Sequence, residues 1–132
     1  NFISSKENIL KLFRYSDESY ISEDYQKLVS YYNDLSKPDS CAMIFTHESA
    51  IPYFLKKNTC SKYFFMYTAT PKEIQSNIMK DLNNNKPVFL IYKSDIDAYG
   101  HAGDRLKILN KYILDKYSFY EKFKHWEIYK LK

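Results

Sequence analysis

Hydrophobic residues recur with helical spacing in three parts of this 132-residue chain. The first part follows Ser22, a candidate N-cap, and stops at residues 36–39 (SKPD). The second follows residues 70–73 (TPKE), where Thr70 would cap the helix, Pro71 would occupy its first position and Glu73 would complete a capping box. The third begins near Asp104. The inward positions of these helices would be Tyr25, Leu28, Val29, Tyr32 and Leu35, then Ile74, Ile78, Met79 and Leu82, then Leu106, Leu109, Tyr112 and Ile113.

Four shorter apolar runs have the length of strands. They are residues 41–45 (CAMIF), 63–67 (YFFMY), 88–92 (VFLIY) and 126–131 (WEIYKL). The first three lack alternation, which is typical of strands buried on both faces of a parallel sheet. The last is less apolar and fits a sheet edge. Between the first two, a short helix would begin at Thr46 or His47 and end near Leu55.

The order of these elements predicts the fold class. A helix is followed by strand and helix three times, and then by a last strand, which indicates an α/β fold with right-handed crossovers. We expect a three-layer Rossmann-like sandwich, with a mostly parallel four-stranded sheet and helices on both faces. Residues 1–132 would form a single α/β domain, in which residues 1–21 are an irregular lead-in from a preceding segment. The chain opens at Asn1, so we interpret it as a piece of a longer protein.

Composition narrows the classes of partner. Hydrophobic residues make up 45% of the chain, as in a globular domain, and no run approaches the ~20 apolar residues that cross a bilayer. The formal net charge is +4, but only Arg14 and Arg105 are arginines. Nucleic-acid binders more usually concentrate arginine for bidentate contacts, so no nucleic-acid partner is expected.

The two cysteines indicate a compartment. Cys41 and Cys60 lie near the N-terminal ends of the first two predicted strands. If these strands are parallel neighbours, ~4.8 Å apart, the cysteines are within reach of a disulfide, which would require an oxidising compartment. The alternative is two independent buried thiols. No histidine pair lies near them with zinc-ligand spacing, so no metal site is expected.

Polar residues follow the predicted strands where open α/β sheets bind ligands. His47 and Glu48 follow the first strand, Tyr67 and Thr70 the second, and Asp95 the third, with Thr68, Ser94 and Asp97 nearby. They predict a ligand-binding crevice, although such residues also cap helices and solvate loops. The scattered histidines and the absence of a GxSxG motif predict no catalytic residue, and no cofactor is expected.

Residues 100–103 (GHAG) lie between a predicted strand and a predicted helix. A phosphate cradle would resemble this segment, but the GxGxxG and P-loop patterns are absent. The chain has only two glycines, so a tight turn with positive φ is the favoured use.

Three neighbouring strings carry a family resemblance: residues 45–48 (FTHE), 52–57 (PYFLKK) and 59–67 (TCSKYFFMY). They resemble a recurring segment of certain bacterial membrane proteins. Those proteins are similar to type-C glycosyltransferases of the dolichyl-phosphate-mannose mannosyltransferase kind, which have many membrane spans and a soluble C-terminal domain. The resemblance covers roughly residues 20–132, and His47 departs from it because Asn is expected there.

The resemblance implies a periplasmic domain of an inner-membrane protein, attached after its last span. Transfer in such enzymes depends on acidic residues in a loop of the membrane part, so this piece would be an accessory domain, not catalytic alone. Its partners would be the membrane-embedded portion of the same polypeptide and a glycan or lipid-linked sugar headgroup. The alternative is a stand-alone Rossmann-like ligand-binding or protein-interaction domain.

Overall fold

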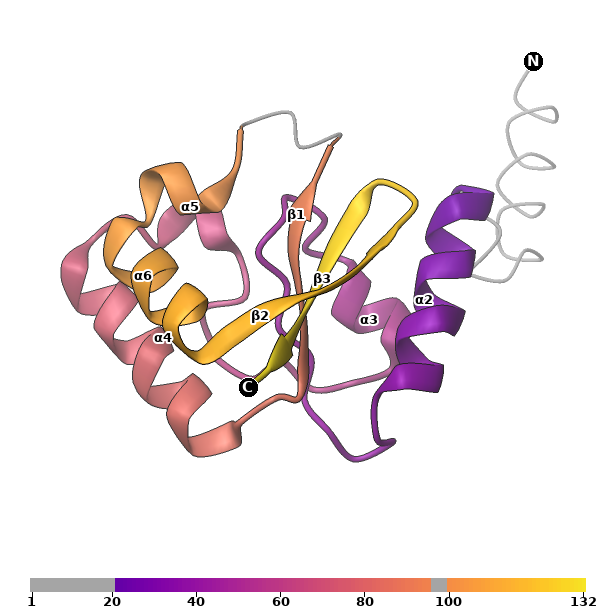
Figure 1. The fold of residues 1–132 in the computed structure, drawn as a ribbon, viewed down its shortest axis with the longest axis horizontal. Coiled ribbons are helices and arrows are strands. Elements are labelled where there is room, and N and C mark those ends of the chain that lie inside the picture. The colour runs from indigo at the N-terminus through magenta and orange to yellow at the C-terminus, as the bar shows by residue number, and fades with distance from the viewer. Residues whose placement is uncertain (1–20, 96–99) are drawn as a thin grey trace, which may run out of the picture.

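The computed structural model describes residues 21–95 and 100–132. A three-stranded sheet lies at its centre, in the order β1-β3-β2, with helices on either side (Figure 1). The strands are β1 (Phe89–Ser94), β2 (Tyr117–Phe123) and β3 (Trp126–Leu131). On one side lie α2 (Glu23–Leu35) and α3 (Ile51–Leu55); on the other lie η2 (Met66–Thr68), α4 (Lys72–Asn85), α5 (Ala102–Arg105) and α6 (Lys107–Lys116).

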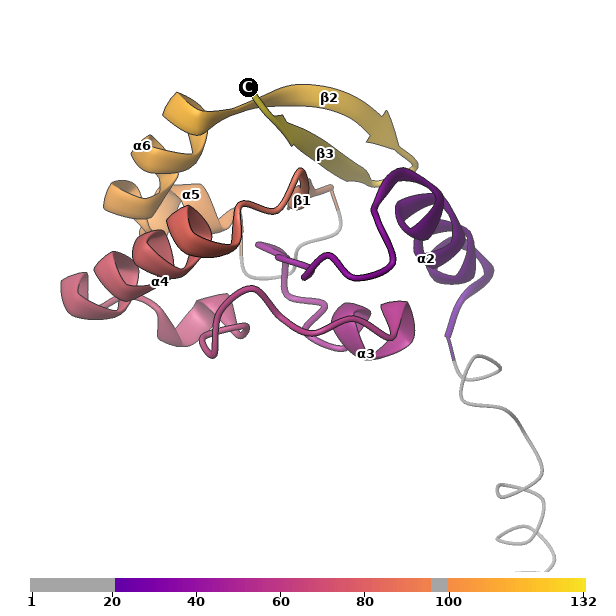
Figure 2. The ribbon, with the colours of Figure 1, turned by 90° about the horizontal axis from the view of Figure 1, so that it is seen from below.

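The predicted fold class, a mostly parallel four-stranded Rossmann-like sandwich, is wrong. β3 runs antiparallel to both of its neighbours, and Tyr129 lies opposite Leu90 on β1 and opposite Phe119 on β2. Residues 41–45 form no strand and meet their neighbours at isolated parallel bridges, Ala42 with Thr59 and Ile44 with Ile91. The sheet is therefore built from a hairpin that packs against β1, and Figure 2 shows this hairpin and α3 on opposite sides of β1.

Two more strand predictions need correction, one in its existence and one in its position in the sheet. Residues 63–67 lead into the 3₁₀ turn η2, and Phe64 and Phe65 are 47% and 41% exposed, so this aromatic run is not a buried strand. Residues 126–131 do form a strand, but it is the central one and not an edge. The true edge, β2, was missed because most of its side chains are exposed and carry no apolar pattern.

Two hydrophobic cores lie on the two faces of β1. Alternate residues of 42–45 and of β1 point to opposite sides, which explains why both runs are apolar throughout. The core beside α4 and α6 includes Met43, Phe45, Leu90 and Tyr92, and the core beside α2 and α3 includes Ala42, Ile44, Phe89 and Ile91.

The helices that were predicted from apolar spacing are present. Ser22 caps α2, accepting a hydrogen bond from the Tyr25 N–H at 3.3 Å. Helix α4 forms, but Thr70 does not cap it: Pro71 occupies the N-cap position, with no side-chain hydrogen bond. The predicted helix near Asp104 is divided at Leu106 into α5 and α6.

Helix α3 begins later than predicted. Its N-cap is Ala50, so neither Thr46 nor His47 caps it. It ends at Leu55, as predicted, and its C-cap Lys56 lies in the left-handed region with φ 54°.

The disulfide between Cys41 and Cys60 is present, with Cα atoms 4.9 Å apart, so the alternative of two independent thiols is excluded. The Ala42 N–H donates to the Asn58 carbonyl at 2.8 Å, and the Cys60 N–H donates to the Ala42 carbonyl at 3.0 Å. These parallel contacts bring the two cysteines side by side. The bridge closes a loop with a sequence separation of 19.

Replacing both cysteines by alanine should lower the free energy of unfolding by about 3 kcal/mol, because the unfolded chain regains the freedom of a loop of this length. Urea unfolding of the oxidised protein and of the double variant Cys41→Ala/Cys60→Ala measures the difference. The wild-type protein in excess reductant is the matched control and should lose a similar amount. A double variant as stable as the oxidised protein would contradict the prediction.

Candidate functional site

The residues predicted to line a ligand crevice lie in different surroundings. His47 and Glu48 lie in the turn before α3, and Asp95 follows β1. Tyr67 lies in η2, and Thr70 comes just before α4. Asp97, which was expected beside them, lies outside the described residues.

Glu48 is a buried carboxylate, 7% exposed. Its Oε1 accepts a hydrogen bond from the Trp126 indole N–H at 3.1 Å, and its Oε2 lies 3.9 Å from His47 Nδ1. No group in the described part of the chain hydrogen bonds to Oε2. Tyr25 packs edge-on against Trp126 at 5.5 Å, and burial together with the Glu48 charge raises the pKa of Tyr25. Glu48 therefore joins the turn before α3 to the central strand β3.

Asp95 contacts the β2–β3 hairpin. Its carboxylate pairs with Lys122, and its N–H donates to the His125 carbonyl at 2.8 Å. The His125 ring packs against Trp126 at 5.7 Å, and its Nε2 lies 3.4 Å from Asp24 on α2. Asp95 and Glu48 thus both contact the β2–β3 hairpin, Asp95 beside its turn and Glu48 at Trp126.

Tyr67 and Thr70 have other partners. The Arg105 guanidinium lies 4.4 Å from the centre of the Tyr67 ring. The Thr70 carbonyl accepts from Gln75 Nε2 at 2.9 Å, and Gln75 Oε1 accepts from the Leu109 N–H at 3.2 Å. Gln75 is buried and joins α4 to α6, a role that its polar side chain did not suggest in the sequence. A ligand-binding role for His47, Glu48, Tyr67, Thr70 and Asp95 stays a prediction.

His101 caps α5 from a half-buried position. Its Nδ1 accepts from the Gly103 N–H at 2.9 Å, and its Nε2 lies 3.1 Å from the Tyr92 carbonyl. Together these contacts require the neutral ring with its proton on Nε2. Burial and then Lys93 lower the pKa of His101, and they outweigh the backbone hydrogen bond to Tyr92 and the charges of Asp104 and Glu127.

The two glycines of this segment have different roles. Gly100 has φ +75°, as a tight turn requires, so the predicted turn is confirmed there. Gly103 lies within α5, where an added Cβ would come 2.6 Å from both His101 Nδ1 and Asn110 Oδ1. Gly103 therefore permits the close approach of His101 and Asn110.

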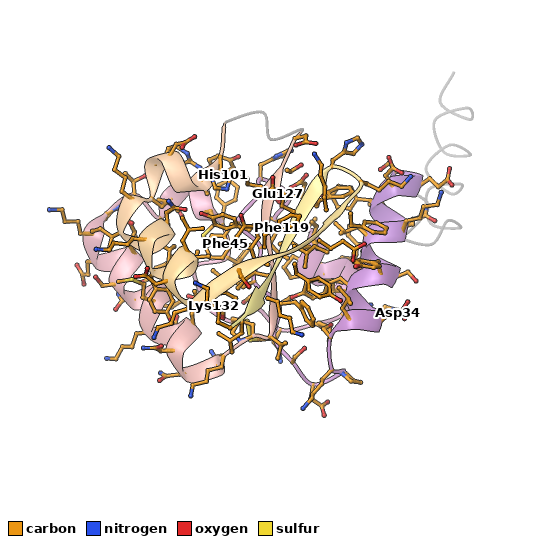
Figure 3. The ribbon with its side chains drawn as sticks, viewed as in Figure 1. Asp34, Phe45, His101, Phe119, Glu127 and Lys132 are labelled. Carbon is orange, nitrogen blue, oxygen red and sulfur yellow. A yellow bond between two sulfur atoms is a disulfide. The ribbon has the colours of Figure 1, made fainter. Side chains whose placement is uncertain are left out.

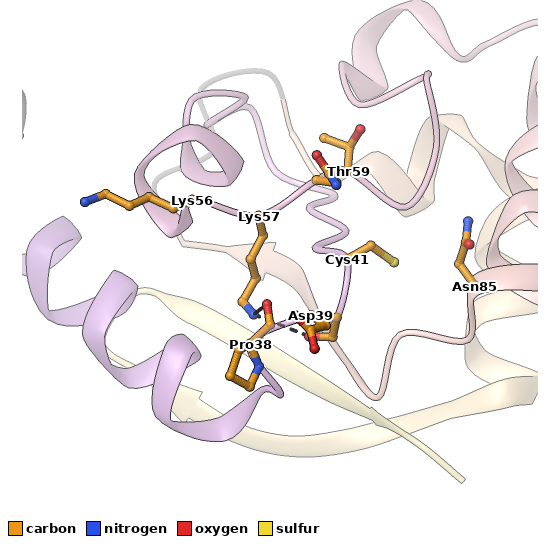
Figure 4. A pocket seen from close by; sticks show the side chains of 9 residues that line it. Pro38, Asp39, Cys41, Lys56, Lys57, Thr59 and Asn85 are labelled. Carbon is orange, nitrogen blue, oxygen red and sulfur yellow. Dashed lines mark hydrogen bonds between the residues drawn. The ribbon is translucent and has the colours of Figure 1, made fainter.

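A hollow of about 650 Å³ lies beside the disulfide (Figure 4). Lys57 crosses it, and its Nζ donates to the carbonyls of Lys37 at 2.6 Å and Pro38 at 3.1 Å. The charge of Lys57 thus holds the turn after α2. The hollow is lined by residues 38–41, 56–59 and Asn85.

A second hollow of about 390 Å³ lies beside His101, between α6 and the sheet. Sequence reasoning did not find either hollow, because each is lined by residues distant in the chain. Within residues 21–95 and 100–132, no three His, Cys, Asp or Glu side chains are grouped as metal ligands would be. In the same residues no helix is long and apolar enough to cross a membrane.

Comparison with solved structures shows a likeness of fold. The chain matches no protein-family model and no curated protein. It is similar to the crystal structure of the C-terminal globular domain of an oligosaccharyltransferase from Archaeoglobus fulgidus, at 14% sequence identity. The likeness covers 85% of this chain and 99% of that chain, with a TM-score of 0.45. A likeness at this level establishes neither a family nor a function.

Truncating Glu48 should destabilise the fold, because the buried Trp126 N–H loses its acceptor. The Glu48→Ala variant is expected to lose about 1–3 kcal/mol of unfolding free energy, measured in urea at neutral pH. The Glu48→Gln variant keeps a side-chain oxygen for Trp126 and should lose less. Equal losses in the two variants would contradict a structural role for this hydrogen bond.

The lowered pKa of His101 should make stability depend on pH. Above the ordinary histidine pKa of ~6.5 both states are neutral, but below it the unfolded state binds the proton first, so the unfolding free energy falls as the pH falls towards the folded-state pKa. The His101→Asn variant keeps a capping side chain but cannot be protonated, so its stability should fall less over the same pH window. Urea midpoints of both proteins at several pH values test this, and identical pH profiles would contradict it.

Proposed function

We propose that this chain is an extracytoplasmic accessory domain of a membrane glycosyltransferase that uses lipid-linked sugar, and that it is not catalytic alone. Its partner would be the membrane-embedded portion of the same polypeptide. A glycan or the headgroup of a lipid-linked sugar would be its ligand.

The observation that carries this proposal is the disulfide between Cys41 and Cys60. Structural disulfides persist in oxidising compartments and are rare in reducing ones. The bridge is built into the fold, because Cys60 is only 2% exposed and the backbone around it is hydrogen-bonded. It supports a location outside the cytoplasm.

The candidate polar residues support an accessory role, because their side chains form contacts within the folded domain. The Glu48 carboxylate accepts from Trp126, Asp95 pairs with Lys122, and the ring of His101 contacts the backbone on both sides. Groups held in this way position structural elements. The chemical step of the proposed enzyme would then lie in its membrane part.

The resemblance of residues 45–67 supports the class of enzyme. Within this segment Tyr53, Phe64 and Phe65 are exposed, which gives the domain aromatic surface for packing against the membrane part. The alternative was a stand-alone Rossmann-like ligand-binding or protein-interaction domain, and the antiparallel sheet removes its Rossmann-like character.

Two measurements test the proposal. The coding sequence upstream of Asn1 should encode several hydrophobic spans, and a start codon immediately before Asn1 would contradict the proposal. The protein isolated from its own cells under alkylating, denaturing and non-reducing conditions should contain no free thiol, because both cysteines are paired. Two alkylated cysteines would contradict the extracytoplasmic location.

A further inference from the structure

The hollow beside His101 has the volume of a small-molecule site, although none of the residues predicted to bind a ligand lies in it. Its volume of about 390 Å³ falls within the range of about 300–1,000 Å³ that is usual for such sites. Loop, helix and sheet all contribute to it. It is lined by Tyr92, Lys93, His101, Gly103, Asp104, Asn110, Leu114 and Tyr129.

A row of aromatic rings leads into this groove from the edge of the sheet. Phe119 on β2 is 56% exposed and packs edge-on against Tyr129 at 6.0 Å. Tyr129 lies 4.5 Å from Tyr92, which in turn packs edge-on against His101 at 4.7 Å. Figure 3 labels His101, Glu127 and Phe119 among the side chains of the structure. The rings pack against one another, so the row is preformed in the absence of a ligand.

Polar groups face the same groove. Asn110 Oδ1 is buried, and no group in the described part of the chain hydrogen bonds to it. This atom lies against Gly103 beneath the surface of the groove, so a ligand in the groove does not reach it. The exposed side chain of Asp104 supplies acceptors at the rim.

The charges of the groove balance. Lys93 is its cation and Asp104 is its anion, and the carboxylate of Glu127 acts on Tyr129, whose pKa is raised by burial and by this neighbour. An anionic ligand such as a phosphate would meet these carboxylates. A neutral ligand with many hydroxyl groups fits the lining better.

We propose that this groove binds a neutral carbohydrate. The apolar C–H face of a pyranose ring would lie against Tyr129, with Leu114 beside it, because aromatic faces carry negative charge and attract the polarised C–H groups of a sugar. Sugar hydroxyls would donate to the exposed carboxylate of Asp104. A second sugar residue would extend along the row towards Phe119.

This site would supply the glycan contact of the proposed accessory domain. The carbohydrate proposal is argued from the residues of the groove and does not depend on the location of the protein. A chain whose cysteines are reduced in its own cells would contradict the proposed function and leave the groove in place. A groove that binds no sugar would leave the exported location in place.

The experiment is a titration of the 132-residue chain followed by amide chemical shifts in NMR. The probes are methyl β-D-glucopyranoside and N,N′-diacetylchitobiose, whose equatorial substituents leave flat apolar ring faces, and inorganic phosphate. We expect saturable shifts at Tyr92, His101 and Tyr129 with at least one sugar, and tighter binding of the disaccharide. No response to either sugar, shifts confined to other surfaces, or groove shifts with phosphate alone would overturn the proposal.

Substitutions in the groove test whether the sugar binds there. Tyr129→Leu keeps apolar volume but removes the ring, and it should weaken sugar binding roughly fivefold or more. Asp104→Ala changes an exposed position, so it tests the groove even where the Tyr129 variant folds poorly, and it should also weaken binding. The matched control Tyr120→Leu changes an exposed tyrosine on β2 that packs against Phe89 and does not line the groove, and it should bind as the wild type does. Unchanged affinity in both groove variants, or equal losses in the control, would overturn the proposal.

Discussion

The burial of β1 on both faces is the constraint on which the rest of this structure depends. Leu90 and Ile91 are each 0% exposed, so a layer of helices is needed on each side of the strand. Both edges of such a strand must also be paired, since buried backbone groups need partners. β3 supplies one edge, and residues 43–45 supply the other: the Phe45 N–H donates to the Ile91 carbonyl at 2.8 Å and the Ile91 N–H to the Met43 carbonyl at 3.2 Å.

Buried polar side chains join the elements that surround this strand. Glu48 connects the turn before α3 to β3, Gln75 connects α4 to α6, and His101 connects α5 to β1. Each contacts a group that burial would otherwise leave without a partner, which is why polar residues are retained at these positions. Glu48, Gln75 and His101 therefore help to fix the arrangement of the helices around the sheet.

The proposed binding surface is the groove in which aromatic side chains lie beside polar side chains. The β2–β3 hairpin leaves Phe119 exposed and brings Tyr129 beside Tyr92, while α6 brings Asn110 to the same groove. The disulfide joins Cys41 and Cys60, and neither cysteine lines this groove. The disulfide supports the proposed location outside the cytoplasm, and the groove supports the proposed contact with a carbohydrate.

The sequence by itself determined the features that depend on neighbouring residues or on contiguous patterns. Ser22 and the apolar spacing after it define α2, and the run from Phe89 is a strand. The sequence placed the two cysteines within possible reach of each other, and the structure decided that they pair. Apolar runs show that a strand is buried on both faces, but they carry no information on strand direction, so the parallel sheet was a wrong inference from a correct burial pattern. Only the tertiary structure decided that Trp126–Leu131 is central, that β2 is its partner, and that Glu48 accepts from Trp126, 78 residues away. The physical reason is that these outcomes are set by long-range pairing and by the hydrogen bonds that buried groups must find, and neither is written in local sequence spacing.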